Sequence, residues 1–181
     1  KRIYAIPPFT NVVSLDFEDH PFTRYRFDAP CALCGAGDSY RKQGPGTLRT
    51  VMEVAAKQLL MAGVTSAVDL GAPLTESLAV RERIDKGEIP GPRMSMSGPW
   101  ITRQGGGMTD QFGGITVTST AQAAAEVEKL AKAGVDVIKA HSGLTRDDYQ
   151  AIADTAHKFG IRVHAHVYAE VTSNCVIDVR R

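Results

Sequence analysis

The sequence predicts an α/β protein made of parallel β/α repeats, and three observations support this prediction. Short apolar runs begin just after a glycine, at residues 63–70, 134–141 and 160–168. Each run follows a segment whose apolar residues have helical spacing, as in a β/α repeat. Because strands joined by crossover helices are parallel, the ionisable residues at their ends should meet at the carboxyl edge of the sheet. These residues are Asp69, Lys139 with His141, and His164 with His166.

The first repeats are expected between residues 47 and 97. A helix begins near Thr47 and is ended by Gly63, and Gly87 ends the next helix. The expected order is a helix from 47, a strand at 64–70, a helix at 74–86 and a strand at 93–97. The first helix should bury one apolar stripe, which consists of Leu48, Val51, Val54, Ala55, Leu59 and Leu60.

The pattern breaks at residues 99–117, where glycines are frequent and neither a helical nor a strand period is present. Loops this long between repeats are uncommon and are usually functional or mobile. We expect this loop to leave the carboxyl edge of the sheet; the alternative is a flexible insertion. The two helices that follow have capping-box signals, Ser119 with Gln122 and Thr145 with Asp148. The apolar positions expected on the second helix are Tyr149, Ile152, Ala153 and Ala156.

The composition excludes several classes of function. The chain has 181 residues, enough for one well-buried domain. Its 21 Lys and Arg balance 20 Asp and Glu to a net charge of +1, so nothing favours binding to nucleic acid or to an anionic membrane. No apolar run approaches the roughly 20 residues of a membrane span. We therefore expect a soluble, cytoplasmic protein.

The first 46 residues give the weakest signals. A strand is expected near Val12, and continuing it would place Asp16, Glu18 and His20 on one face. Such a triad is either a metal site or simply solvated. The Cys-x-x-Cys pair at 31–34 is either half of a zinc site or redox pair, or two loop cysteines without function.

Lys139 is the most informative residue. In an apolar parallel strand it must either reach the open edge or be buried against a partner, because an isolated buried ammonium is very costly. A buried lysine can form a Schiff base or a carbamate with carbon dioxide; alternatively its head reaches solvent or Asp69. His164 and His166 lie two residues apart on one face, and imidazole is a common metal ligand. His157, in the preceding helix, is interpreted as structural or exposed.

Several segments closely resemble the amidohydrolase superfamily, with the prolidase-like and imidazolonepropionase-related enzymes as the nearest branch. They include Ala-Gly-Val-Asp-Val-Ile-Lys at 133–139 and a segment ending Arg-Val-His-Ala-His at 162–166. The other segments are 60–71, 81–93 and 97–99, and together they follow the family order across residues 47–170. The resemblance implies part of a TIM-like (β/α)8 barrel.

The resemblance also implies a metal-dependent amidohydrolase that cleaves an amide or dipeptide C–N bond by attack of metal-bound hydroxide. One or two divalent ions, usually zinc, would be held by a carboxylated Lys139, whose carbamate bridges them, and by His166. Tyr168, His164 and His141 are the candidate substrate contacts. The family's first-strand His-x-His, sixth-strand His and eighth-strand Asp have no counterparts here.

The expected organisation is therefore an irregular segment at 1–46, a partial barrel at 47–170 and a tail at 171–181. Since open sheet edges favour pairing, we expect a homo-oligomer. One alternative is a catalytically incomplete fragment that oligomerises or pairs with a missing half. A second alternative is a lysine Schiff-base enzyme.

Overall fold

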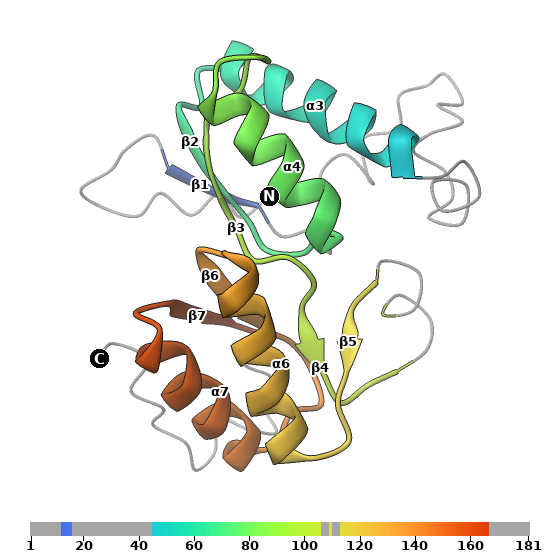
Figure 1. The fold of residues 1–181 in the computed structure, drawn as a ribbon, viewed down its shortest axis with the longest axis vertical. Coiled ribbons are helices and arrows are strands. Elements are labelled where there is room, and N and C mark those ends of the chain that lie inside the picture. The colour runs from blue at the N-terminus through green and yellow to red at the C-terminus, as the bar shows by residue number, and fades with distance from the viewer. Residues whose placement is uncertain (1–11, 16–44, 106–108, 110–112, 167–181) are drawn as a thin grey trace. The chain divides into compact units, whose positions relative to one another are not determined.

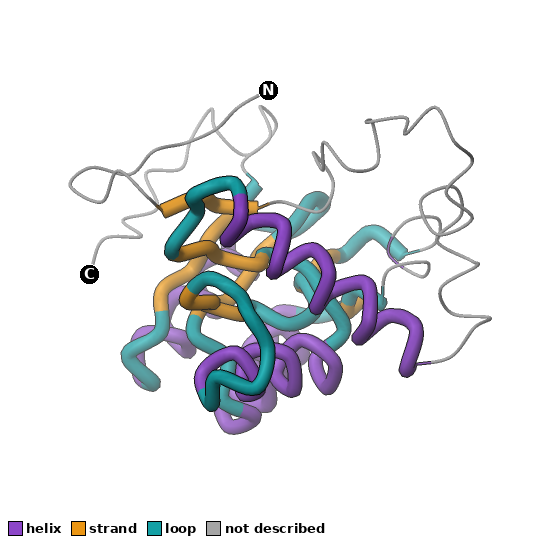
Figure 2. The backbone as a smooth tube through the Cα atoms, turned by 90° about the horizontal axis from the view of Figure 1, so that it is seen from above, coloured by secondary structure: helices purple, strands orange, loops and turns teal. Residues whose placement is uncertain are grey.

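The computed structural model describes residues 12–15, 45–105, 109 and 113–166, which form two compact units (Figure 1). The first unit comprises Lys1–Asp69 with Leu74–Met96, and the second comprises Leu70–Pro73 with Ser97–Arg181. Strands and helices alternate along the described backbone except at residues 93–116, where three strands follow one another. Figure 2 shows the strands and helices in different colours. No described helix is both long enough and apolar enough to cross a membrane.

The first unit contains a parallel sheet of three strands in the order β1-β2-β3. Its core centres on Ala67, Met94 and Met96, with Leu59, Leu78 and Ile84 packed against them. The expected order of elements from residue 47 to 97 is confirmed, although the strands are shorter than expected. The elements are β1 (Val12–Leu15), α3 (Pro45–Met61), β2 (Ser66–Asp69), α4 (Leu74–Asp85) and β3 (Arg93–Met96).

The apolar stripe expected on α3 was wrong in part. Met52 and Ala56 are buried, whereas Val54 is 51% exposed and Leu60 is 37% exposed. Val54 is two residues from both buried positions, which places it about 200° around the helix from each of them. The helix buries one narrow face, so apolar residues outside that face remain in contact with solvent.

The second unit contains a parallel sheet in the order β5-β4-β6-β7. Helices α6 and α7 pack against each other, as Figure 1 shows, and α7 also contacts β6 and β7. The expectation of no strand within residues 99–117 was wrong, because β4 and β5 lie there. Each has two residues, too few to show an alternating pattern. The elements are β4 (Ile101–Thr102), β5 (Ile115–Thr116), α6 (Thr120–Ala133), β6 (Val137–Ala140), α7 (Arg146–Lys158) and β7 (Arg162–Ala165).

The two predicted caps differ in the structure. Thr145 and Asp148 form the complete capping box, with both side chains bonded to the backbone of the other residue. Ser119 accepts a hydrogen bond from the Gln122 amide, but the Gln122 side chain bonds Thr118 N, one residue before the position that a capping box requires. The four apolar positions predicted for α7 are all buried.

Candidate active site at the carboxyl ends of β6 and β7

The register between β6 and β7 brings together the ionisable residues at the carboxyl ends of these two strands. Lys139 is paired with His164 in the parallel ladder. Paired residues of a parallel sheet project to the same face, and so do residues two positions apart on one strand. His141 and His166, which follow the ends of β6 and β7, therefore continue the face that carries Lys139 and His164.

Lys139 is only 2% exposed, so its ammonium group is removed from bulk solvent. The cost of burying a charge makes a stabilising partner or a chemical modification necessary at this position. The pKa of His164 is held below its usual value, chiefly by burial and secondarily by the positive charges of Lys139 and Arg162.

Three rings form a row beside Lys139. The centroid of the Trp100 ring is 5.7 Å from that of His141, and the His141 centroid is 4.8 Å from that of His166. Atoms Nε2 of His141 and Nδ1 of His166 are both buried. The carboxyl ends of two neighbouring strands thus present imidazole nitrogens side by side in a largely dry environment.

Hydrogen bonds orient the His141 ring. Ser142 Oγ lies 2.8 Å from His141 Nδ1 and donates to Gln104 Oε1 at 3.0 Å. A hydroxyl carries one hydrogen, so in this arrangement Nδ1 must be the donor to Ser142. In the neutral ring, Nε2 is then the acceptor. Thr102 supports the same turn by donating to the Ser142 carbonyl at 2.7 Å.

Tyr149 connects the two strand ends from the helix between them. Its hydroxyl lies 2.9 Å from the carbonyl oxygen of His141 and 2.7 Å from that of His166. Tyr149 is 3% exposed and belongs to the buried face of α7. The crossover helix therefore contacts the backbone of both histidines.

A buried carboxylate, Asp148, fixes the beginning of α7. Its oxygens accept hydrogen bonds from Arg103 Nε at 2.6 Å and Nη2 at 2.8 Å. Thr120 Oγ1 and the amide and hydroxyl of Thr145 donate to it as well. Although burial alone would raise its pKa, these donors together hold the pKa of Asp148 well below its usual value. The network joins the end of β4 to the beginnings of α6 and α7.

The structure thus brings together four of the predicted site residues, Lys139, His141, His164 and His166. Asp69 is buried in the other unit, so its convergence with them stays a prediction. The remaining candidates lie outside the described residues, namely Tyr168, Asp16, Glu18, His20, Cys31 and Cys34. The described residues contain no group of three or more His, Cys, Asp or Glu suited to a metal.

Sequence reasoning missed the roles of Trp100 and Tyr149. Trp100 was passed over inside a loop, although it is the single tryptophan of the chain and is buried. Tyr149 was treated only as an apolar helix position. A tyrosine among small and aliphatic residues on a buried helix face is the signal that could have found it, because a buried hydroxyl needs a hydrogen-bond partner.

Two family models match different parts of the chain. The model described as Amidohydrolase family matches residues 35–179. The model described as Phosphonate metabolism protein PhnJ matches residues 1–45. Over 40 residues the chain is 72% identical to an α-D-ribose 1-methylphosphonate 5-phosphate C-P-lyase of Rhizobium meliloti and 68% identical to that of Escherichia coli. This match spans 22% of the chain but only 14% of each lyase, and sequence reasoning did not find it.

Solved structures agree with the longer family match. A putative prolidase from Bifidobacterium longum is 31% identical, with a TM-score of 0.54, and the alignment covers 62% of this chain and 30% of the prolidase. Phenylurea hydrolase B has a TM-score of 0.60 at 20% identity, over 72% of this chain and 38% of the hydrolase. Together with the parallel sheets, these similarities confirm the predicted fold class, part of a TIM-like (β/α)8 barrel.

Proposed function

The chain belongs to the amidohydrolase family, and on that premise we propose that it is a metal-dependent hydrolase that cleaves a C–N bond of the amide type. The observation that supports this most directly is the buried lysine, Lys139, paired in register with His164, which lies two residues before His166. A dipeptide is the proposed substrate class, which the similarity to a putative prolidase supports.

The donor atoms at this edge suit part of a zinc shell. Imidazole is a common zinc ligand, whereas an ammonium group has no lone pair, so a lysine can join the shell only after deprotonation or carboxylation. We assign His166 and a carbamate on Lys139 as ligands of one or two divalent ions. Such ions, when bound, lower the pKa of water and polarise a carbonyl group.

The remaining residues would handle the substrate. His141 is oriented by Ser142 with Nε2 as an acceptor, so it suits an N–H or O–H group of the substrate. Burial, the chief cause of the lowered pKa of His164, favours the neutral ring, which can both donate and accept a hydrogen bond. Tyr168 is proposed as a further substrate contact.

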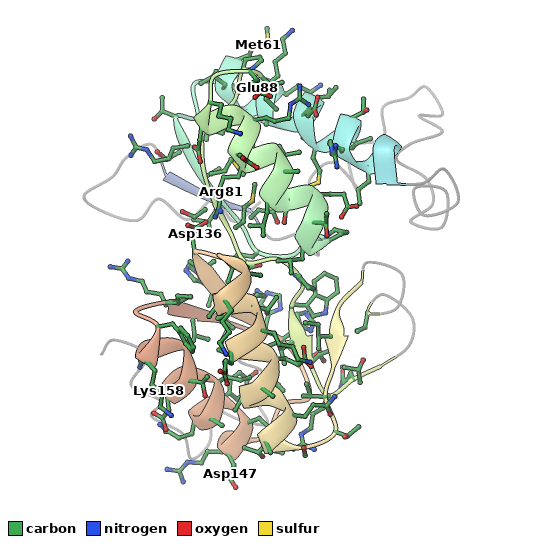
Figure 3. All side chains as sticks on the ribbon, viewed as in Figure 1. Met61, Arg81, Glu88, Asp136, Asp147 and Lys158 are labelled. Atoms are coloured by element: carbon green, nitrogen blue, oxygen red, sulfur yellow. The ribbon has the colours of Figure 1, made fainter. Side chains whose placement is uncertain are left out.

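The test is substitution of the buried lysine. Lys139→Ala should remove most of the bound zinc and lower the rate of dipeptide hydrolysis at least about 100-fold, since it deletes a proposed ligand. Metal content per folded chain, measured by mass spectrometry, and turnover are the measurements. Lys158→Ala is the matched control, because this lysine is exposed at the end of α7 (Figure 3).

Circular dichroism must show that the variant remains folded. Unchanged turnover in Lys139→Ala would exclude the lysine from the centre. Absence of metal and turnover in the unsubstituted chain would contradict the proposed function itself.

A second candidate is a centre that this chain completes only with another subunit. Among the described residues, β7 pairs with β6 alone, and β7 is only partly buried whereas β6 is fully buried. The described part also lacks a cluster of three His, Cys, Asp or Glu ligands. We propose that a second copy covers this edge. Mass measurement in solution separates the two cases: activity that appears only in an oligomer favours the shared centre, whereas an active monomer excludes it.

A further inference from the structure

We propose that Tyr149 is a positioning residue that holds the two imidazole rings of the site at their working separation. Its hydroxyl lies within hydrogen-bond distance of the carbonyl oxygens of His141 and His166, at 2.9 Å and 2.7 Å. These two residues directly follow β6 and β7, where ladder pairing ends. A strand end without further pairing is the part of a sheet that opens most easily.

The geometry explains why a tyrosine is needed. The hydroxyl must reach the carboxyl edge from a helix, and Tyr149 lies in the first turns of α7, whose beginning is fixed by the capping box. The phenol ring of Tyr149 is buried, so packing around the ring holds the hydroxyl in place. Each histidine is also tied through its own amide: His141 N donates to Ile101 O and His166 N to Ala140 O. Tyr149 adds a contact at the carbonyl oxygens of the same two histidines.

The consequence concerns the spacing of the rings. The centroids of His141 and His166 are 4.8 Å apart. Register pairs between β6 and β7 end at Ala140 and Ala165, and each histidine beyond them has one amide hydrogen bond to a neighbouring strand. The hydroxyl has one hydrogen, which it donates to one of the two carbonyl oxygens at a time or shares between them. Because it lies within reach of both, it couples the positions of the two backbones, as groups that orient metal ligands generally do. The metal-binding part of this inference rests on the proposed function, whereas the structural part does not.

The test uses Tyr149→Phe, which keeps the ring and removes only the hydroxyl. Amide hydrogen exchange, followed by NMR, should be about tenfold faster at His141 and His166 and unchanged at Ile138 in the middle of β6. Cobalt(II) affinity, measured by absorption of the bound ion, should fall about tenfold. The matched control is Ile152→Val, a change at a fully buried residue of the same helix whose apolar side chain cannot donate a hydrogen bond to either histidine carbonyl.

The outcomes separate this inference from the proposed function. Ile152→Val should leave cobalt affinity unchanged and alter exchange across the whole sheet, if at all. Local acceleration at the two histidines without any cobalt binding by the unsubstituted chain supports the positioning role and contradicts the metal centre. Uniform or unchanged exchange in Tyr149→Phe overturns the inference, as does cobalt affinity equal to that of a metal-binding unsubstituted chain.

Discussion

Helices α4 and α7 each follow a parallel strand with an ionisable residue at or just after its end, Asp69 in β2 and His141 after β6, yet the ion pairs of the two helices lie at opposite ends. In α4 the pairs are in or just after the last turn, where Arg83 bonds Glu88 at 3.2 Å and Lys86 bonds Glu82 at 2.6 Å. In α7 the pair is in the first turn, where Arg103 bonds the buried Asp148 at 2.6 Å. The first turn of a helix that follows a parallel strand lies at the carboxyl edge of the sheet.

The difference between the two helices shows which polar contacts hold the fold rigidly in place. The side chains of Lys86 and Glu82 are 58% and 64% exposed, and exposed pairs contribute little because water and salt screen them. Asp148 is removed from solvent and its donors come from three separate segments. The buried polar network is therefore located beside the proposed site in the second unit. The exposed ion pairs of α4 lie instead at the C-terminal end of that helix.

The largest expected effect is the loss of the buried carboxylate. Asp148→Asn replaces a charged acceptor by an amide that turns two hydrogens toward existing donors, so we expect the free energy of unfolding to fall by about 3 kcal/mol. Chemical denaturation at pH 7 measures it. Asp147→Asn is the matched control. It is the same substitution one residue earlier, at a side chain that points away from the fold (Figure 3).

Asp147→Asn should cost only a small fraction of that value, through its interaction with the helix dipole. Equal losses in the two variants would mean that the Arg103–Asp148 network contributes no more than an exposed acid, and the contrast with α4 would disappear.

The same carboxylate predicts a dependence on pH. The pKa of Asp148 is lower in the folded chain than the usual value of about 3.9. Below about pH 5 the unfolded chain therefore binds more protons than the folded chain, and the free energy of unfolding should decrease as the pH falls. The loss between pH 7 and pH 3 should be smaller in Asp148→Asn. Parallel losses in both proteins would contradict the assignment.

Sequence reasoning placed the long elements well and the short ones poorly. The helix at 74–86 and the helix opened by Thr145 were found because a long apolar period and a cap agree over several turns. The strand expected at 64–70 is confined to Ser66–Asp69, since ladder pairing with neighbours decides where a strand ends. The two-residue strands β4 and β5 exist only through such pairing.

The candidate site also has a part that could be predicted from the sequence and a part that could not. The pairing of Lys139 with His164 agrees with the prediction from two features of the sequence: each strand begins just after a glycine, and strands joined by a crossover helix are parallel. The contact of Trp100 with His141 and the reach of Tyr149 to two carbonyl groups depend on how distant segments pack. No spacing rule contains that information. Residues 1–45, where a first-strand His-x-His was sought, match a different family model.

The smallest expected effect concerns two glycines, one just after helix α4 and one just before helix α7. Gly87, just after α4, and Gly143, before α7, both have φ of +72°. Alanine at either position should cost about 1 kcal/mol of backbone strain. A Cβ at Gly87 would meet nothing within 4 Å, whereas one at Gly143 would lie 2.7 Å from Gln104 Cγ. We therefore expect Gly143→Ala to be the more destabilising, by up to about 1 kcal/mol.

The second effect of Gly143→Ala is on the site itself. Gln104 accepts the hydrogen bond of Ser142, whose oxygen orients the His141 ring. Displacing Gln104 frees that hydrogen, and Ser142 can then donate to Nδ1, which moves the ring proton to Nε2. Nitrogen NMR of the histidine rings distinguishes the two tautomers. Gly87→Ala should leave the His141 tautomer as it is, and an unchanged tautomer in Gly143→Ala would mean that Gln104 does not orient this ring.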